Sequence, residues 1–361
     1  MYKDQFRGYD PYDLAEASIS LPHFILSKLS FVNKVSPVNF RNLLGILPTD
    51  NAKSNGLWLW AYALDGIEKH SGEISYLLDW IEKNKATDFD EFSMGFTFRM
   101  ALSRYASEPG KTSLIISLFI VFPLIELYKK QKDPKLLEKI ESFENLLEYK
   151  WLKYEDETIL WYSYLPERYD EVYNATAKVG KFYSLLHGIS AKPKYKEKIF
   201  RILKYLSEKQ NCDGSWGYSV NSSYVDNFHS AFVLDSIFHM RKVVDNDCFE
   251  RMFVTGLNDY LQNCFDNDLR PLHFHKKHKP LDIRSRILET EIRDCANAII
   301  LFSKLGMKGK ASGVLNWTNK FLLDPKRNYY YFYKNKLFSN KINFVRWQAW
   351  MALAIAEYNV Q

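Results

Sequence analysis

Four polar residues stand near the start of apolar, helix-like stretches at comparable intervals along the chain. They are Asn174, Asp226, Arg293 and Arg346, and the intervals between them are 52, 67 and 53 positions. Such a recurrence predicts repeated two-helix modules that bring these side chains to one place. The two arginines favour an acidic ligand, because a guanidinium group binds a carboxylate through two parallel hydrogen bonds.

Two kinds of catalysis are compatible with the carboxylates and the histidine at these helix starts. Asp226 and Glu291 could be the paired carboxylates of a glycoside hydrolase, whose separation distinguishes inverting from retaining chemistry. Alternatively, His229 or a tyrosine could remove a proton next to the carboxylate of a uronic acid, while Arg293 or Arg346 neutralises the developing charge. That second route leads to elimination or epimerisation. Asp226, His229 and Glu291 are therefore the catalytic candidates.

Aromatic residues near the same helix starts are candidates for the walls of such a site. The faces of aromatic rings pack against the apolar C–H edges of sugars. They join Asn174, Arg293 and Arg346 as candidate substrate-binding residues. The aromatic candidates are Trp161, Trp216, Tyr218, Tyr331 and Trp347.

Structural roles are open for several of the same residues. Asp226 precedes an apolar run, where aspartate is a favoured N-terminal cap of a helix. His229 follows three positions later on the same helical face, and it could be a histidine whose hydrogen bonds are satisfied locally. Arg346 could form a structural ion pair with Glu291, and Trp216 could anchor the Asp-Gly turn beside it.

Two kinds of helix alternate along the chain and must position these residues. Charged amphipathic helices, such as 194–209, have apolar residues at helical spacing, whereas 228–238 and 296–302 are apolar nearly all round. A helix that is apolar all round belongs in the interior. An inner ring of helices wrapped by an outer ring satisfies both patterns. The sequence therefore predicts an all-α fold, an (α/α)6 toroid with short β-hairpin-like connections, as a single domain over residues 1–361.

The expected elements follow this alternation. The turn at Asp213-Gly214 is expected to be tight, because glycine tolerates positive φ. Strand-like connections are expected at 160–164, 272–275 and 329–333. Helices are expected at 56–69, 73–83, 92–105, 114–130, 135–149, 249–265 and 309–323, and a last helix is expected to open at 344–350.

Composition limits the classes of partner. The formal net charge is +6, from 49 Lys and Arg against 43 Asp and Glu, and the basic residues are scattered. This mildly favours an acidic ligand, such as an acidic oligosaccharide or polysaccharide intermediate, and argues against a nucleic-acid partner. Hydrophobic residues make up 47% of the chain, enough for a large core. The oligomeric state is not predicted.

Neither a metal nor another cofactor is expected. In a strand, His273 and His275 would project to one face, which suits two ligands, and His278 lies nearby. No third ligand has suitable spacing, and three neighbouring lysines at 276, 277 and 279 oppose a cation. The four cysteines form no CxxC pair, which is typical of free thiols in a reducing compartment. They are Cys212, Cys248, Cys264 and Cys295.

No membrane span is expected either. The longest apolar run, 114–127, is too short to cross a bilayer and contains Pro123. Residues 1–7 lack the apolar core of a secretory signal, so a cytoplasmic location is expected.

One motif resembles a family of toroidal enzymes. Tyr205-Leu206, Gln210, Gly214 and Trp216 match the aromatic-aliphatic-x3-Gln-x3-Gly-x-Trp repeat of squalene and other triterpene cyclases. The motif occurs once here, and in those enzymes it is structural. Their acidic Asp-x-Asp-Asp motif and their metal-binding Asp-Asp-x-x-Asp motif are absent. The resemblance therefore implies a toroid but does not imply cyclase chemistry.

A second resemblance covers nearly the whole chain. It is to a poorly characterised bacterial and archaeal family whose genes tend to lie in surface-polysaccharide clusters, and whose architecture is similar to six-hairpin glycosidases, polysaccharide lyases and uronyl epimerases. The family pattern has Asp-Ile-His-Ser where this chain has Glu291-Ile292-Arg293-Asp294, so a permanent cation replaces a possible acid/base imidazole. The motifs that carry the resemblance are at 8–13, 213–216, 226–229, 291–296 and 346–351.

Three hypotheses for function follow. The first is an enzyme of polysaccharide biosynthesis or modification that acts on an acidic oligosaccharide as a hydrolase, lyase or uronyl epimerase. The second is a glycan-binding or scaffold protein without catalysis, and the third is a relative of terpene cyclases, in which aromatic rings stabilise cations. An open cavity with two nearby carboxylates favours the first, a mouth of aromatic residues and cations favours the second, and a closed apolar cavity favours the third.

Overall fold

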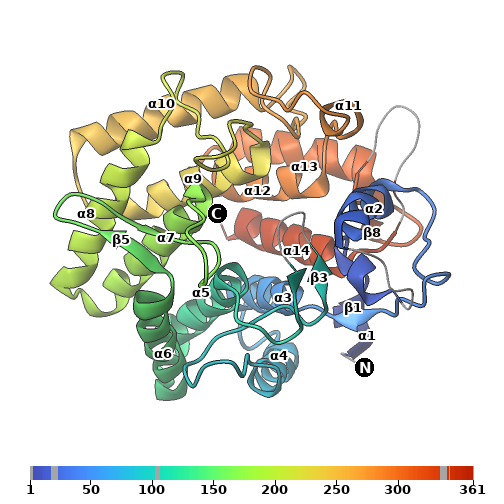
Figure 1. The fold of residues 1–361 in the computed structure, drawn as a ribbon, viewed down its shortest axis with the longest axis horizontal. Coiled ribbons are helices and arrows are strands. Elements are labelled where there is room, and N and C mark those ends of the chain that lie inside the picture. The colour runs from blue at the N-terminus through green and yellow to red at the C-terminus, as the bar shows by residue number, and fades with distance from the viewer. Residues whose placement is uncertain (1–2, 18–22, 102–105, 334–339, 341, 361) are drawn as a thin grey trace.

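A closed ring of six helices forms the interior of the computed structural model (Figure 1), which describes residues 3–17, 23–101, 106–333, 340 and 342–360. Each helix packs against the next, and the last packs against the first. Interior helices have to be apolar on all sides, and α5 is buried from Leu114 to Ile125. In ring order, the helices are α3 (Ala52–Asp65), α5 (Leu114–Gln131), α7 (Tyr173–Ser190), α9 (Asn227–Met240), α12 (Ile292–Lys304) and α14 (Val345–Asn359).

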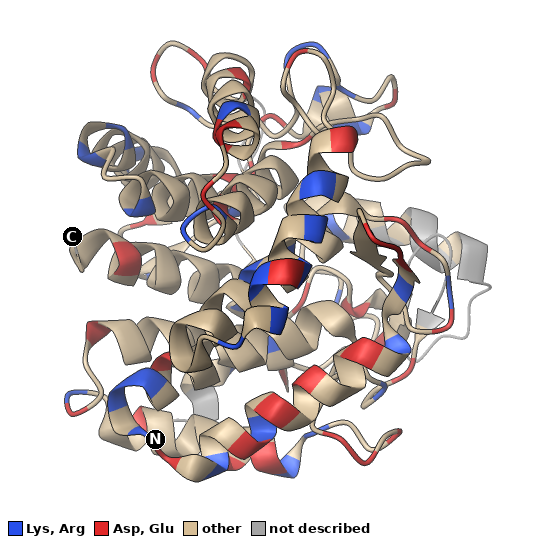
Figure 2. Ribbon diagram, turned by 90° about the vertical axis from the view of Figure 1, so that its left-hand side faces the viewer, with Lys and Arg blue, Asp and Glu red and all other residues tan. Residues whose placement is uncertain are grey.

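Amphipathic helices cover the outside of this ring. Each packs against the inner helix that precedes it in the chain. In Figure 2, the outer helices that face the viewer carry Lys, Arg, Asp and Glu along their outward sides, and the ribbon behind them is mostly uncharged. These outer helices are α4 (Ser71–Lys83), α6 (Pro134–Lys150), α8 (Pro193–Glu208), α10 (Asp247–Asn263) and α13 (Lys308–Leu322). The predicted (α/α)6 toroid is thus confirmed.

Short elements connect the helices and close the N-terminal side. The residue after β1 (Arg7–Gly8) pairs with the residue before α14, through a bridge between Tyr9 and Phe344, so the N-terminal segment lies beside the start of the last helix. Helix α2 (His23–Val35) and β8 (Tyr329–Tyr330) both lie at the right of Figure 1. The remaining short helices are α1 (Lys3–Phe6), the 3-10 helix η1 (Asp13–Glu16) and α11 (Arg284–Ile287).

Four antiparallel pairs of strands lie between the helices of the described residues. They pair locally, so none builds a larger sheet. The pairs are β1 (Arg7–Gly8) with β2 (Thr49–Asp50), β3 (Met100–Ala101) with β4 (Ala106–Ser107), β5 (Leu152–Glu155) with β6 (Leu160–Tyr162), and β7 (Leu323–Asp324) with β8 (Tyr329–Tyr330).

The expected helices agree with the structure except over 92–105. Residues 92–99 form no helix, and residues 102–105 lie outside the described part of the chain. Tertiary hydrogen bonds override the local pattern, because Ser113 N–H donates to Met94 O and Gly110 N–H donates to Phe96 O. A side chain at Gly95 would also place its Cβ 2.0 Å from Lys111 O. The strand-like stretch 272–275 forms one isolated bridge, between Phe274 and Asp226.

The Asp-Gly turn before α9 has the expected geometry. Gly214 has a φ of +99°, and a Cβ there would lie 2.7 Å from Thr255 O. Gln210 donates to the carbonyls of Gly214 and Met252, and the Trp216 indole donates to Leu206 O.

Within the described residues, no helix is long and apolar enough to span a bilayer.

Candidate functional site

One cavity of about 670 Å³ opens where the inner helices begin. Every inner helix contributes a lining residue from its first turn, because the ring points all six N-terminal ends the same way. The polar residues that recur at helix starts in the sequence, such as Asn174, Arg293 and Arg346, therefore lie around this one cavity. These first-turn residues are Lys53, Ile115, Asn174, Phe228, Arg293 and Arg346.

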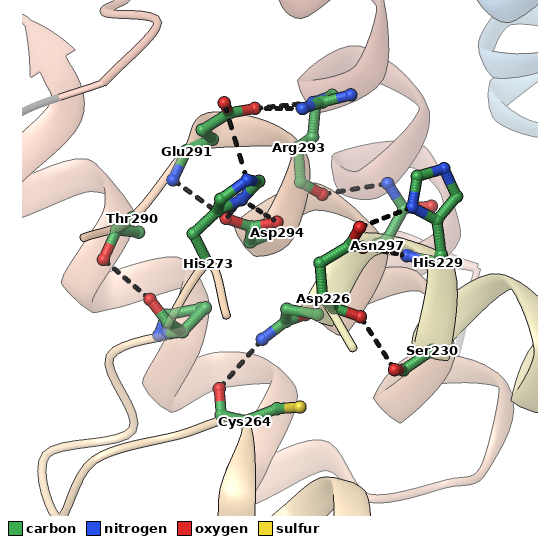
Figure 3. A network of polar contacts seen from close by, with 12 residues as sticks. Asp226, His229, Ser230, Cys264, His273, Thr290, Glu291, Arg293, Asp294 and Asn297 are labelled. Carbon is green, nitrogen blue, oxygen red and sulfur yellow. Dashed lines mark hydrogen bonds and ion pairs between the residues drawn. The ribbon is translucent and has the colours of Figure 1, made fainter. Parts of the chain in front are cut away.

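An aspartate–histidine pair lies on the α9 side of the cavity. The backbone N–H of His229 donates to Asp226 Oδ1 over 2.8 Å, so Asp226 caps α9, and His229 Nδ1 lies 2.7 Å from Asp226 Oδ2 (Figure 3). Burial raises the pKa of Asp226, but the adjacent His229 outweighs burial, and the net pKa is about 2. The carboxylate is therefore ionised near neutral pH, so Nδ1 of a neutral His229 carries the proton and Nε2 is left with a lone pair.

Glu291 does not line the cavity. Its side chain is fully buried and lies between two cations, with Oε1 2.8 Å from Lys34 Nζ and Oε2 accepting from Arg293. It also forms a reciprocal capping box with Asp294 at the start of α12. Burial raises the pKa of Glu291, yet Arg293 and Lys34 outweigh burial and hold the pKa below its usual range. Glu291 therefore positions two cavity cations.

A second histidine reaches the cavity from the segment after α10. His273 Nδ1 lies 3.0 Å from Asp294 Oδ2, and its Nε2 lies 3.9 Å from Glu291 Oε1 (Figure 3). Burial lowers the pKa of His273, but the carboxylates of Asp294 and Glu291 outweigh burial and raise it. His273 is therefore more readily protonated than an ordinary histidine.

Four basic side chains line the cavity on the side of α2, α3, α12 and α14. Arg293 and Lys34 share Glu291, and Arg346 donates to Asp10. The hypothesis that Arg346 pairs with Glu291 is therefore wrong, because the N-terminal segment supplies its partner. The fourth basic side chain on this side is Lys53, which has no carboxylate partner among the described residues.

The pKa of the Tyr12 phenol is affected by three of these basic side chains. Burial raises the pKa of Tyr12, but Lys34, Arg293 and Arg346 outweigh burial and lower the pKa overall. A phenol ionises more easily when cations surround it. The cavity is thus suited to an anionic group.

Two of the five aromatic candidates line the cavity. Trp347 lies between two guanidinium groups, with its ring 5.1 Å from Arg293 Cζ and 4.9 Å from Arg346 Cζ. Tyr218 stacks on Tyr224, and the ring centroids are 5.5 Å apart. Both tyrosines line the cavity.

The other three aromatic candidates lie outside the cavity lining. Trp216 is buried beneath the Asp-Gly turn, where it packs against Gly256 of α10. Trp161 packs edge-on against Tyr169, and Tyr331 donates its hydroxyl to Asp324. Of the predicted residues, the structure gathers Asn174, Tyr218, Asp226, His229, Arg293, Arg346 and Trp347 around one cavity.

Lys34, Lys53 and His273 are among the cavity residues that the sequence did not predict as site residues. The position of Lys53 in the sequence could have predicted it as a cavity residue, because it lies in the first turn of an inner helix, as Arg293 and Arg346 do. Lys34 lies on α2 and His273 on a connection, so neither shares that position. His273 entered the sequence analysis only as a possible metal ligand.

The three clustered histidines have separate partners. His273 contacts Asp294, His275 contacts Asp259 and His278 contacts Asp213. Ligand atoms of Asp213, Asp259 and His275 do lie within 4.8 Å of one another. His275 Nε2 lies 3.1 Å from Asp259 Oδ1, and His278 Nε2 lies 2.6 Å from Asp213 Oδ2.

The class of fold is shared with solved carbohydrate enzymes. No family model matches the chain, and no curated protein matches its sequence. The chain is similar to cellobiose 2-epimerase from Bacillus thermoamylovorans B4167, with a TM-score of 0.65 and 11% identity over 85% of this chain and 88% of that one. A glycosyl hydrolase of family 88 from Bacteroides vulgatus has a TM-score of 0.55 and 11% identity, over 85% and 92%.

A polysaccharide lyase is also similar, with a TM-score of 0.52 and 14% identity over 85% of this chain and 89% of that one. At such identities the likeness shows the α/α toroid alone. The reaction has to be inferred from the residues of the cavity.

Proposed function

We propose that this protein is an enzyme that moves a proton on an acidic sugar, by epimerisation or elimination next to a uronate carboxylate, in the biosynthesis or modification of a polysaccharide. The observation that carries the proposal is the Asp226–His229 pair in a cavity that Arg293, Arg346 and Lys34 make positive. The fold shared with epimerases, lyases and hydrolases of carbohydrates supports a sugar as the ligand.

In this proposal His229 is the general base. Asp226 holds the proton on Nδ1, so the Nε2 lone pair is free to accept the proton from the carbon next to the carboxylate. Arg293 and Arg346 bind that carboxylate and stabilise the second negative charge that develops on it. The protonated form of His273 is a proton donor for the same intermediate. Return of a proton to the opposite face gives an epimer, whereas loss of a leaving group gives an unsaturated sugar.

Proton transfer is favoured over glycoside hydrolysis by the carboxylates available. Among the described lining residues these are Asp170, Glu171 and Asp226. Asp170 pairs with Arg168, and Glu171 pairs with Lys209. With Glu291 outside the lining, the predicted pair of Asp226 and Glu291 does not face the cavity together, as the two carboxylates of a glycosidase would.

The test measures the incorporation of deuterium from D2O into a panel of uronate-containing oligosaccharides. Deuterium appearing at the carbon next to the carboxylate indicates proton transfer, and the unsaturated product distinguishes elimination from epimerisation. Asp226→Asn and His229→Gln should each slow exchange by at least about 10²-fold. Asp65→Asn is the matched control, because Asp65 and His70 form a similar pair, 2.6 Å apart, on the outside of the molecule.

Release of new reducing ends without exchange and without an unsaturated product would replace this proposal with hydrolysis. Saturable binding of uronates without exchange or cleavage would replace it with the glycan-binding function.

A further inference from the structure

Lys53 has an unusual environment at the floor of the cavity. It is the second residue of α3, it lines the cavity, and it is 7% exposed. Aromatic rings surround its amine, with Nζ 4.2 Å from the centroid of Phe119, 5.6 Å from Trp350 and 5.9 Å from Phe228. Among the described residues, Lys53 makes no hydrogen bond or ion pair to a carboxylate.

Three other largely buried lysines are paired with a carboxylate, whereas Lys53 and Lys178 have no such pair among the described residues, and of these two only Lys53 lines the cavity. Lys34 lies 2.8 Å from Glu291, Lys181 lies 2.5 Å from Asp235, and Lys304 lies 3.0 Å from Asp235. Each of these amines is stabilised as an ammonium ion by a carboxylate. The Lys53 amine is instead available to a ligand in the cavity.

The charges that face Lys53 disfavour its protonation. Lys178 of α7 lies over the same Phe119 ring, with Nζ 4.8 Å from the centroid. Arg346 of α14 and Arg293 of α12 add two more cations, and the N-terminal end of α3 adds the positive end of a helix dipole. The opposing charge is Asp10, whose carboxylate accepts hydrogen bonds from Arg346 and Asn51.

We propose that Lys53 is a nucleophilic amine that forms an imine with the carbonyl carbon of an open-chain sugar acid. This inference rests on the proposed function for its ligand, an acidic sugar bound by Arg293 and Arg346. It adds a covalent step and a requirement, namely that the substrate has a free aldehyde or keto group.

The step balances without any oxidant or reductant. The nitrogen lone pair of neutral Lys53 adds to the carbonyl carbon, and the carbonyl oxygen takes a proton to give a carbinolamine. Loss of that hydroxyl group as water forms the C=N bond, and hydrolysis later returns the amine and the carbonyl. The protonated imine draws electrons from the carbon next to it. Where the carbonyl carbon and the carboxylate are bonded to the same carbon, this is the carbon that His229 deprotonates in the proposed function, and its C–H bond becomes easier to break.

The pKa of Lys53 agrees with this role. Burial is the main cause that lowers it, and the cations Arg346, Lys178 and Arg293 lower it further, whereas Asp10 raises it; the net pKa is well below the ordinary value. An ordinary lysine is neutral in roughly one molecule in 2,500 at pH 7, and each unit of lowering raises that fraction about tenfold. A desolvated lysine beside other cations is a recurrent form of activated amine.

The experiment traps the imine by reduction. The full chain is incubated at pH 7 with glyoxylate, an anionic aldehyde, and with D-glucuronate, each with cyanoborohydride, and the modified lysines are identified by peptide mass mapping. Lys53 should be modified at least about tenfold faster than the exposed Lys196, which serves as the reference in the same digest. Neutral glyceraldehyde should react more slowly than glyoxylate, because it lacks the carboxylate that Arg293 and Arg346 bind.

Two variants test the cause of the reactivity. Lys53→Met removes the amine but keeps a side chain of similar length and its apolar contacts, so it should lose the adduct while its thermal unfolding stays similar. Lys178→Met removes one neighbouring cation and should move the pH profile of Lys53 modification to higher pH. Modification of Lys53 no faster than Lys196 in the wild-type chain would overturn the proposal.

The outcome is separable from that for the proposed function. Deuterium exchange that depends on Asp226 and His229, without a Lys53 adduct, overturns the imine and leaves proton transfer standing. A Lys53 adduct without exchange on any acidic sugar supports the reactive amine and overturns the proposed reaction.

Discussion

Replacing Asp226 with asparagine separates two roles of one side chain. The introduced asparagine would keep the N-terminal cap of α9, since asparagine caps as well as aspartate and its Oδ1 can accept from the His229 N–H. Its amide nitrogen would replace Oδ2, 2.7 Å from His229 Nδ1. An amide N–H donates, so Nδ1 would become the acceptor and the proton would move to Nε2. The lone pair that faces the substrate would be lost.

The magnitude follows from the pKa of Asp226. Its fall from 3.8 to about 2 means that its surroundings favour the carboxylate by about 2.5 kcal/mol, at 1.36 kcal/mol per unit. Because the cap is retained, the expected loss of unfolding free energy is smaller, about 1–2 kcal/mol. Turnover should fall far more, by about 10²–10⁴-fold, as expected when a general base is held in the wrong tautomer.

The assay measures deuterium exchange into a uronate substrate and urea unfolding of the same preparations. Asp65→Asn alters an exterior aspartate–histidine pair and should leave exchange within about twofold of wild type. The reasoning fails if Asp226→Asn exchanges within about threefold of wild type, since an oriented base contributes at least about 10²-fold.

Three further outcomes are expected. Glu291→Gln would leave Lys34 and Arg293 without their buried counter-charge. The free energy of unfolding, measured in urea, should therefore fall by about 3–5 kcal/mol, and a fall below about 1 kcal/mol would contradict a stabilising role for these ion pairs. In wild type, the stabilisation from ionised Glu291 is present above its ordinary pKa of 4.5 and is lost as pH falls through its lower folded pKa; acid unfolding should therefore be steeper than in Glu291→Gln. Gly256→Ala would place a Cβ 2.5 Å from the Trp216 ring. This overpacking should cost about 1–3 kcal/mol of unfolding free energy and lower the melting temperature, while KM stays unchanged. An altered KM would place Trp216 at the substrate.

Local chemistry in the sequence was enough to predict the toroid and part of the cavity. All-round apolar helices alternate with amphipathic ones, and that alternation permits few arrangements other than two concentric rings. The contact between Asp226 and His229 is also local, because residues three apart on a helix are neighbours. Residues at helix starts, such as Asn174 and Arg293, reach the cavity because the ring points those starts the same way.

Only the tertiary structure decided which charges meet. Asp10 pairs with Arg346 across 336 positions, and Lys34 reaches Glu291 from a different helix, so no spacing in the sequence could assign either pair. Glu291 was predicted to be a catalytic residue, but in the closed ring it is the counter-charge of Lys34 and Arg293. The same closure placed Lys53 among aromatic rings without a carboxylate, because its neighbours come from three other inner helices. Periodicity determines which face of a helix is buried, whereas the partners on that face depend on how distant segments pack.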